Sequence, residues 1–226
     1  MHSKSYYEEF YKDRDWSNQY IKVKYQVQSY LNVVNLTSTV QVKKVLDIGC
    51  GTGIYTKIFN DLGYDCRGID FANSAIEKAK TQFPDCDFLQ HDATNIQIQD
   101  KFDMLFVSGF SPFNTTNFEA TQQIINRWSS CLEDEGVIFI LGRTDFSGME
   151  SSSGWFYHTH DQIKTMFAHP DFSMKTYFAY PLFRYLVLTP LLKKPIMSLV
   201  SYISENFIGK IIRKPVRVMT VLVKEL

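Results

Sequence analysis

The sequence has little cysteine and no long apolar run, and both absences narrow its class. Its four cysteines, at positions 50, 66, 86 and 131, do not share the short spacing of a zinc knuckle or a redox pair. Scattered cysteines argue against a secreted disulfide framework and suit a reducing cytoplasm. No window reaches the roughly 18 uninterrupted apolar residues of a membrane span, and residues 1–10 lack the apolar core of a signal peptide. We therefore expect a cytoplasmic protein.

An excess of charge of either sign is also missing. The charges of the 24 basic and 24 acidic side chains cancel, so the chain has no net positive charge to attract a polyanion. Nucleic acid is therefore not an expected partner. Hydrophobic residues make up 45% of the sequence and aromatic residues 15%, which is ample for a packed core. The length of 226 residues predicts one domain, or one domain with an added cap.

Short apolar runs alternate with helical stretches along most of the chain. Strands are predicted at residues 45–48, 64–69, 86–90, 102–107, 136–141, 172–180 and 216–224. Capping-box spacings at residues 74–77, 116–119 and 159–162 predict helix starts between them. This alternation predicts a three-layer α/β domain made of residues 41–180 and 216–226.

Two further segments differ from this pattern. Residues 1–40 are predicted as aromatic-rich helices, which could form a lid over a ligand or pack in the core. Residues 181–215 are predicted as an inserted helical cap and carry six basic residues but only one acid, Glu205. That mixture suits peripheral contact with an anionic membrane surface, while a substrate cap or a dimer interface are alternatives. The oligomeric state stays open.

A glycine-rich turn follows the first predicted strand, in the run Val45–Gly53. Glycines at positions 49, 51 and 53 lack Cβ atoms, so a ligand and the backbone can approach closely. The following helix turns its positive end to this point and favours an electron-rich group. A dinucleotide fingerprint would need its third glycine at position 54, where Ile54 stands. A nicotinamide cofactor is thus the weaker interpretation.

An acidic residue, Asp70, ends the next predicted strand. Because neighbouring parallel strands end at the same edge of a sheet, its carboxylate should lie beside the glycine-rich turn. There it can accept hydrogen bonds from both hydroxyls of a ribose.

Together, Val45–Gly53 and Asp70 resemble the first motif and the ribose-binding acid of the class I S-adenosylmethionine-dependent methyltransferases. The resemblance implies a Rossmann-like three-layer sandwich with a mostly parallel seven-stranded sheet and an antiparallel last strand. It implies that Asp47 and Gly49 hold the methionine end of S-adenosylmethionine, that Phe71 flanks the adenine and that Asp92 meets its amino group. The cofactor residues expected are Asp47, Gly49, Gly51, Gly53, Asp70, Phe71, Asp92, Ala93 and Ser108.

The acceptor side is less marked in the sequence. His158 and His160 follow the fifth strand, at the edge where ligands bind in open α/β sheets, and are the candidate catalytic bases. They could instead be parts of a helix start capped by Thr159. No metal is expected, because no carboxylate–histidine motif accompanies them. The candidate substrate-binding residues are Tyr7, Phe110, Arg143 and Trp155.

These features predict an S-adenosylmethionine-dependent enzyme that methylates an oxygen of a small molecule, such as a sugar or a biosynthetic intermediate. Residues 108–114 lack the Asp/Asn-Pro-Pro-aromatic pattern of methyltransferases that act on nucleobases or glutamine. A lipidic or lipid-linked acceptor at a membrane surface is an alternative. A non-catalytic module that binds the cofactor and regulates a partner is another.

Overall fold

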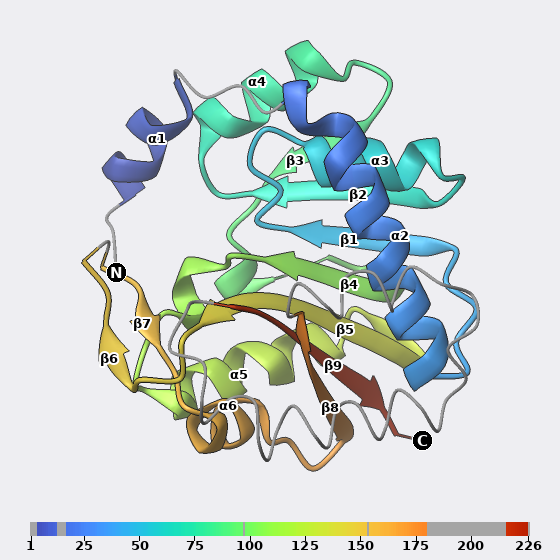
Figure 1. Cartoon of the computed structure of the whole chain (residues 1–226). Coiled ribbons are helices and arrows are strands. Elements are labelled where there is room, and N and C mark those ends of the chain that lie inside the picture. Colours follow the sequence, from blue (N-terminus) through green and yellow to red (C-terminus); the bar gives the residue numbers. More distant parts are fainter. Residues whose placement is uncertain (1–3, 13–16, 97, 153, 180–215, 226) are drawn as a thin grey trace.

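The computed structural model describes residues 4–12, 17–96, 98–152, 154–179 and 216–225 (Figure 1). Its centre is one seven-stranded sheet with the order β3-β2-β1-β4-β5-β9-β8. β9 runs antiparallel to both of its neighbours, and the remaining strands are parallel to one another. The strands are β1 (Lys44–Ile48), β2 (Asp65–Asp70), β3 (Asp87–Gln90), β4 (Phe102–Ser108), β5 (Leu132–Thr144), β8 (Phe172–Ala179) and β9 (Val216–Lys224).

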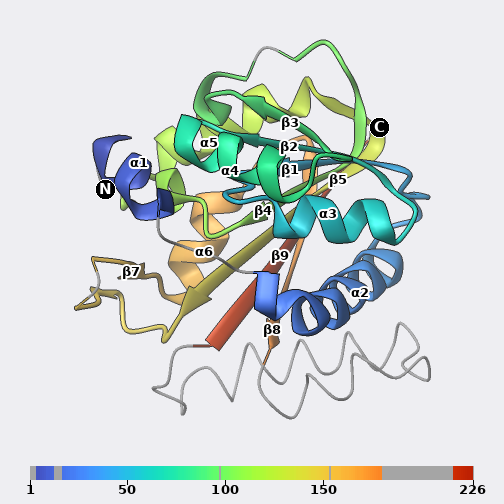
Figure 2. The ribbon, with the colours of Figure 1, turned by 90° about the horizontal axis from the view of Figure 1, so that it is seen from above.

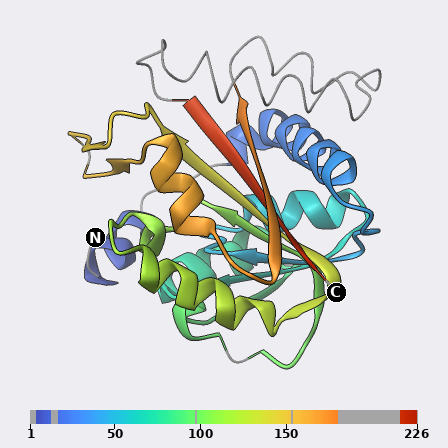
Figure 3. The same cartoon turned by 90° about the horizontal axis from the view of Figure 1, so that it is seen from below.

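Helices cover both faces of this sheet (Figures 2 and 3). Those of the described chain are α1 (Lys4–Lys12), α2 (Tyr20–Thr37), α3 (Ile54–Asp61), α4 (Asn73–Gln82), α5 (Phe118–Ser129) and α6 (His160–Phe167). α2 and α3 pack on one face, where their apolar side chains form a cluster with Phe106 and Phe139. α5 and α6 pack on the other face, around Trp128 and Phe167. The predicted three-layer fold with an antiparallel last strand is confirmed.

Each predicted strand is present within a few residues of its expected bounds, but β5 is longer. It begins at Leu132, which pairs with Phe102 of β4, and it continues to Thr144 because it pairs with β9 from Val137 onward. A hairpin of β6 (Met149–Glu150) and β7 (Phe156–Tyr157), which the sequence pattern did not predict, follows β5. In Figure 1 this hairpin and α1 lie at the same edge of the sheet.

The predicted capping box at the start of α4 is wrong. The helix begins at Asn73, and no side chain of its own N-cap residue caps it. The Asp70 carboxylate accepts a hydrogen bond from the Ala72 amide at 2.9 Å, which turns the chain into the helix directly after β2. The Glu8 carboxylate, from α1, instead accepts the amides of Asn73 and Ser74 at 2.9 and 3.0 Å.

Of the other two predicted capping boxes, one is present and one is not. The box at residues 159–162 is confirmed, because the Thr159 hydroxyl and the Gln162 side chain each accept the other residue's amide. At α5 the box is wrong: Asn117, not Thr116, is the N-cap, and its side chain accepts the Ala120 amide at 3.2 Å. An Asn side chain satisfies the same free amides as a threonine and starts the helix one residue later.

The predicted cap at residues 181–215 lies outside the described residues, which stop at 179 and resume at 216. Within the described ranges, no helix is both long enough and apolar enough to cross a membrane.

The direction of the sheet's connections changes between β1 and β4. From β1 the chain first builds β2 and β3 on one side and then returns to add β4 and β5 on the other. Ligands of open α/β sheets bind at such a point, beyond the carboxyl ends of the strands. The glycine-rich turn leaves β1 here.

Candidate functional site

The turn after β1 is built from glycines with left-handed backbone conformations. Gly49, Gly51 and Gly53 have φ angles of 70°, 55° and 85°, which residues with a Cβ adopt only at a cost. The amides of Gly49 and Cys50 both donate to the Ile69 carbonyl, at 2.8 and 3.0 Å, and so join the turn to β2. The turn is therefore fixed at the end of β2, next to Asp70.

Side chains of the protein itself take up the space beside two of the three glycines. A Cβ at position 53 would lie 2.5 Å from the Phe88 ring, and one at position 51 would lie 3.1 Å from the Tyr11 ring. At position 49 the nearest atom, in the Phe110 ring, would be 3.5 Å away, an ordinary contact. Of the three, only Gly49 lines a cavity.

Asp70 contacts this turn directly and is 5% exposed. One carboxylate oxygen accepts the Gly51 amide at 3.0 Å and the other accepts the Ala72 amide. Burial raises the pKa of Asp70 above its usual value, and these two amides oppose the rise. Each carboxylate oxygen can accept a second hydrogen bond, so Asp70 retains acceptor capacity for a ligand.

Asp47, on β1, is 1% exposed. The Thr56 hydroxyl, on α3, donates to its carboxylate at 2.7 Å. Burial raises the pKa of Asp47 to about 7, although the hydrogen bonds from Thr56 oppose this shift. At neutral pH the carboxyl group is thus divided between its charged and neutral forms.

A small cavity of about 50 Å³ lies above the turn. Its walls include Gly49, Asp70, Phe71, Asp92 and Ala93, five of the residues predicted to bind the cofactor. The Asp92 carboxylate accepts the amide and the hydroxyl of Thr94, at 3.0 and 2.7 Å, and so shapes the floor of this cavity.

α1 covers this cavity. Its Tyr11 forms part of the wall, and the ring of Tyr7 meets that of Phe71 edge-on at a centroid distance of 5.5 Å. The helix is fixed to α4 by the Glu8 contacts described above and by a hydrogen bond from the Ser74 hydroxyl to the Glu8 carbonyl at 2.9 Å. Within residues 1–40, α1 therefore lies at the candidate site, whereas α2 packs on the sheet.

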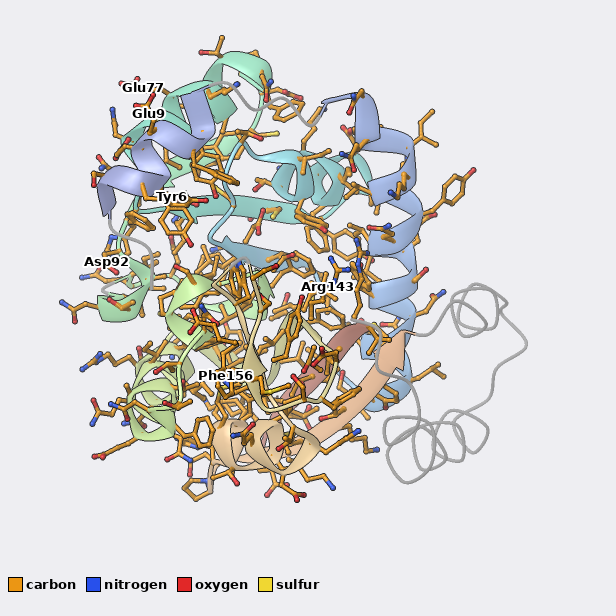
Figure 4. The ribbon with its side chains drawn as sticks, turned by 60° about the vertical axis from the view of Figure 1, so that its left-hand side comes forward. Tyr6, Glu9, Glu77, Asp92, Arg143 and Phe156 are labelled. Atoms are coloured by element: carbon orange, nitrogen blue, oxygen red, sulfur yellow. The ribbon has the colours of Figure 1, made fainter. Side chains whose placement is uncertain are left out.

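A larger cavity of about 490 Å³ lies beside the small one, beyond the ends of β4, β5 and β9. Gly109 and Phe110, which directly follow β4, line both cavities. The large cavity brings together five of the predicted residues: Ser108, Phe110, Arg143, Trp155 and His158. Figure 4 labels Asp92, which lines the small cavity, and Arg143 and Phe156, which line the large one.

The two candidate histidines occupy different environments. His158 is 7% exposed, lines the large cavity, and its Nε2 lies 2.7 Å from the Thr115 carbonyl oxygen. Burial lowers the pKa of His158, so the neutral ring with the proton on Nε2 is favoured and Nδ1 is left basic. His160 instead stacks on Phe146, with ring centroids 4.1 Å apart, and is not among the residues that line the cavity.

Several cavity residues were not predicted from the sequence. Tyr55 comes from α3, Thr144 from the end of β5 and Arg217 from the start of β9. The Arg217 guanidinium donates to the hydroxyl of Tyr30 on α2 at 2.8 Å. Only the pairing of β5 with β9 brings position 217 here, and no local pattern reports that pairing.

Comparison with known proteins gives one family match. Residues 45–136 match the family described as a methyltransferase domain. Two curated relatives are the trans-aconitate 2-methyltransferase of Escherichia coli (strain 55989 / EAEC), 28% identical over 101 residues, and the demethylmenaquinone methyltransferase of Renibacterium salmoninarum, 34% identical over 77 residues. These matches cover 44% and 34% of this chain. The chain spans only 38% and 32% of those relatives.

Among solved structures, a plantazolicin methyltransferase, BamL, in complex with a triazolic desmethylPZN analog and SAH, has a similar fold. The TM-score is 0.65 with 18% identity, and the match covers 98% of this chain and 91% of the other. At this identity the likeness concerns the fold, and it extends well beyond the segment that matches the family.

Proposed function

We propose that the chain is a class I S-adenosylmethionine-dependent methyltransferase and that it transfers the methyl group of this cofactor to a small molecule, because residues 45–136 match a methyltransferase domain. One observation carries the proposal: Gly109 and Phe110 line both the cavity above the glycine-rich turn and the large cavity beside it. A cofactor in the first and an acceptor in the second would meet at these two residues. Methyl transfer is an in-line displacement, so the acceptor atom must be aligned behind the methyl group in a site that excludes water.

In this proposal Asp70 binds the ribose hydroxyls, and Phe71, Asp92 and Ala93 bind the adenine. The role of Asp70 is supported by its position beside the turn. The roles of Phe71, Asp92 and Ala93 are supported by their place in the wall of the same small cavity. The positive end of α3, which starts at Ile54 directly after the turn, favours an electron-rich group of the cofactor. Asp47, which lines neither cavity, would act on the methionine end from below Gly49.

We assign the large cavity to the acceptor because about 490 Å³ lies in the range that binds small molecules. Its walls are mainly apolar and aromatic, with a few polar groups such as Ser108 and Thr144. For an oxygen acceptor, His158 is the proposed general base, because its neutral form is favoured and Nδ1 can accept a proton.

Replacing His158 with asparagine should lower kcat by about 100-fold while leaving the affinity for the cofactor unchanged, as expected for loss of a general base. The pH–rate profile of the wild type should fall on the acid side, and the variant should lose that limb. His160→Asn is the matched control and should retain activity. Equal loss in both variants would point to a structural role.

The function is tested with the purified chain, labelled S-adenosylmethionine and a metabolite extract. The expected result is a labelled small product together with S-adenosylhomocysteine. Label found only in protein or nucleic acid would contradict the proposal. Turnover would also exclude a purely regulatory, non-catalytic module.

We further propose that α1 is a lid that must move for the cofactor to enter, because the cavity beneath Tyr11 holds only about 50 Å³. Glu8→Ala removes the carboxylate that accepts two amides at the start of α4. Losing such charged contacts should raise both the association and the release rates of S-adenosylhomocysteine by about tenfold. Stopped-flow binding measures both rates.

Hydrogen exchange provides the companion measurement for the lid. Amides of residues 4–12 should exchange faster in Glu8→Ala than in the wild type, whereas those of β1 and β4 should not change. Glu8→Gln keeps an acceptor oxygen and should fall between the two. Unchanged binding rates combined with faster exchange would show that α1 does not limit access.

A further inference from the structure

Two arginines lie side by side in the wall of the large cavity. Arg143 near the end of β5 and Arg217 near the start of β9 are direct partners in the antiparallel register. Directly opposite residues of such a pair lie on the same face, with Cβ atoms about 5 Å apart. Both line the cavity, and both are exposed.

Placing these two arginines opposite each other is unfavourable unless a negatively charged group lies between them. Like charges directly opposite each other in a sheet repel, and a guanidinium stays charged at any physiological pH. In the described ranges neither arginine has a carboxylate within the 4.0 Å of an ion pair, and no Asp or Glu lines the cavity. The cavity wall thus carries two positive charges and no described negative one.

The contacts of Arg217 also hold it in place. Its Nη1 donates to the hydroxyl of Tyr30, which is 5% exposed and packs on Phe106 and Phe139. A guanidinium has five N–H donors, so this bond leaves others for a ligand. Its charge also reaches the hydroxyl of Tyr55, where it opposes the rise in pKa that burial causes.

The cavity has a polar side and an apolar side. Arg143 and Arg217 are exposed, whereas Phe113, Ile163 and Phe167 are buried against the α5–α6 face. Figure 4 shows Arg143 on the α2 side of this region and Phe156 on the side of α6. A ligand with one anionic end and an apolar body would match both parts.

We propose that Arg143 and Arg217 bind an anionic group of the methyl acceptor, so that the substrate is a small organic acid carrying a carboxylate or a phosphate. Both groups accept paired hydrogen bonds from the planar guanidinium. Tyr30 acts as a positioning residue through Arg217. The proposal rests on the assignment of this cavity to the acceptor, and it deepens that assignment.

The test uses the full chain with three probes that share a phenyl ring: benzoate, phenyl phosphate and the neutral benzamide, which matches benzoate in shape. Calorimetry and the arginine Nε–Hε signals are followed during titration, with and without S-adenosylhomocysteine. At least one anion should bind about tenfold more tightly than benzamide and shift the signals of Arg143 and Arg217. The tighter of the two anions identifies the preferred group.

Variants locate the effect. Arg143→Gln and Arg217→Gln should each reduce anion affinity by about tenfold or more and leave benzamide binding unchanged, since a charged hydrogen bond is lost. Arg127→Gln is the control, because Arg127 lies on α5 and donates to the Thr94 carbonyl outside this cavity. Tyr30→Phe keeps both positive charges and should reduce the affinity for the anion less than Arg217→Gln does.

Two results would overturn the inference: equal affinity for benzamide and both anions, or anion affinity that survives both arginine replacements. Neither depends on the cofactor. A chain that does not bind S-adenosylhomocysteine but prefers the anions would contradict the proposed function alone. A chain that binds it without preferring the anions would contradict this inference alone.

Discussion

Asp70→Ala is expected to weaken the binding of S-adenosylmethionine on the order of 1,000-fold. The proposed ribose contacts are two hydrogen bonds to a charged acceptor, each contributing about 1.5–3 kcal/mol. Asp70 lies at the end of β2 and is 5% exposed, so water cannot easily replace these contacts. Calorimetric titration of the cofactor measures the effect.

The control for this prediction must separate binding from folding, because Asp70 also accepts the Gly51 and Ala72 amides. Asp70→Asn keeps one acceptor oxygen and should retain part of the affinity. Both variants should unfold cooperatively on heating, since the strand pairs of β1 and β2 remain. An Asp70→Ala protein that is folded and binds with wild-type affinity would remove Asp70 from the site.

Features that depend on neighbouring residues were predictable from the sequence. The alternation of short apolar runs with helical stretches predicts the order of strands and helices, because burial on a sheet face imposes its period on the sequence. Thr159 and Gln162 form the expected capping box because both partners lie within one turn. The turn at Gly49 and its proximity to Asp70 follow from the βαβ connection alone.

Features that depend on contacts between distant segments were not predictable. The cap of α4 comes from Glu8, 65 residues away, so the local Ser–Glu spacing predicted the wrong cap. Arg217 becomes a cavity residue only through the register of β5 with β9, which sets it opposite Arg143. Gly51 and Gly53 matched a ligand-binding pattern, yet the rings of Tyr11 and Phe88 occupy the space that their missing Cβ atoms leave.

Asp47→Asn is expected to stabilise the protein without ligand at pH 8. Burial raises the pKa of Asp47 from 3.8 to about 7 in the folded chain. The folded state therefore binds the proton more tightly than the unfolded state, and stability is lost as pH rises from about 4 through 7. At pH 8 the full loss is present, about 4 kcal/mol for a shift of this size, and asparagine avoids it. Chemical denaturation at pH 5 and pH 8 measures the difference.

The same substitution should reduce the affinity for the cofactor on the order of tenfold, because a cationic methionine end favours the charged form of Asp47. Binding to the wild type near pH 7 should then release a fraction of a proton, since the positive charge lowers the pKa of the carboxyl group. Calorimetry in buffers of different ionisation enthalpy detects this release, and Asp47→Asn should abolish it. Thr56→Val removes the hydroxyl that donates to Asp47 at 2.7 Å, so its pKa should rise further and the released fraction should increase. Proton release that is unchanged in Asp47→Asn would mean that Asp47 only supports the turn, and that its raised pKa has no part in binding.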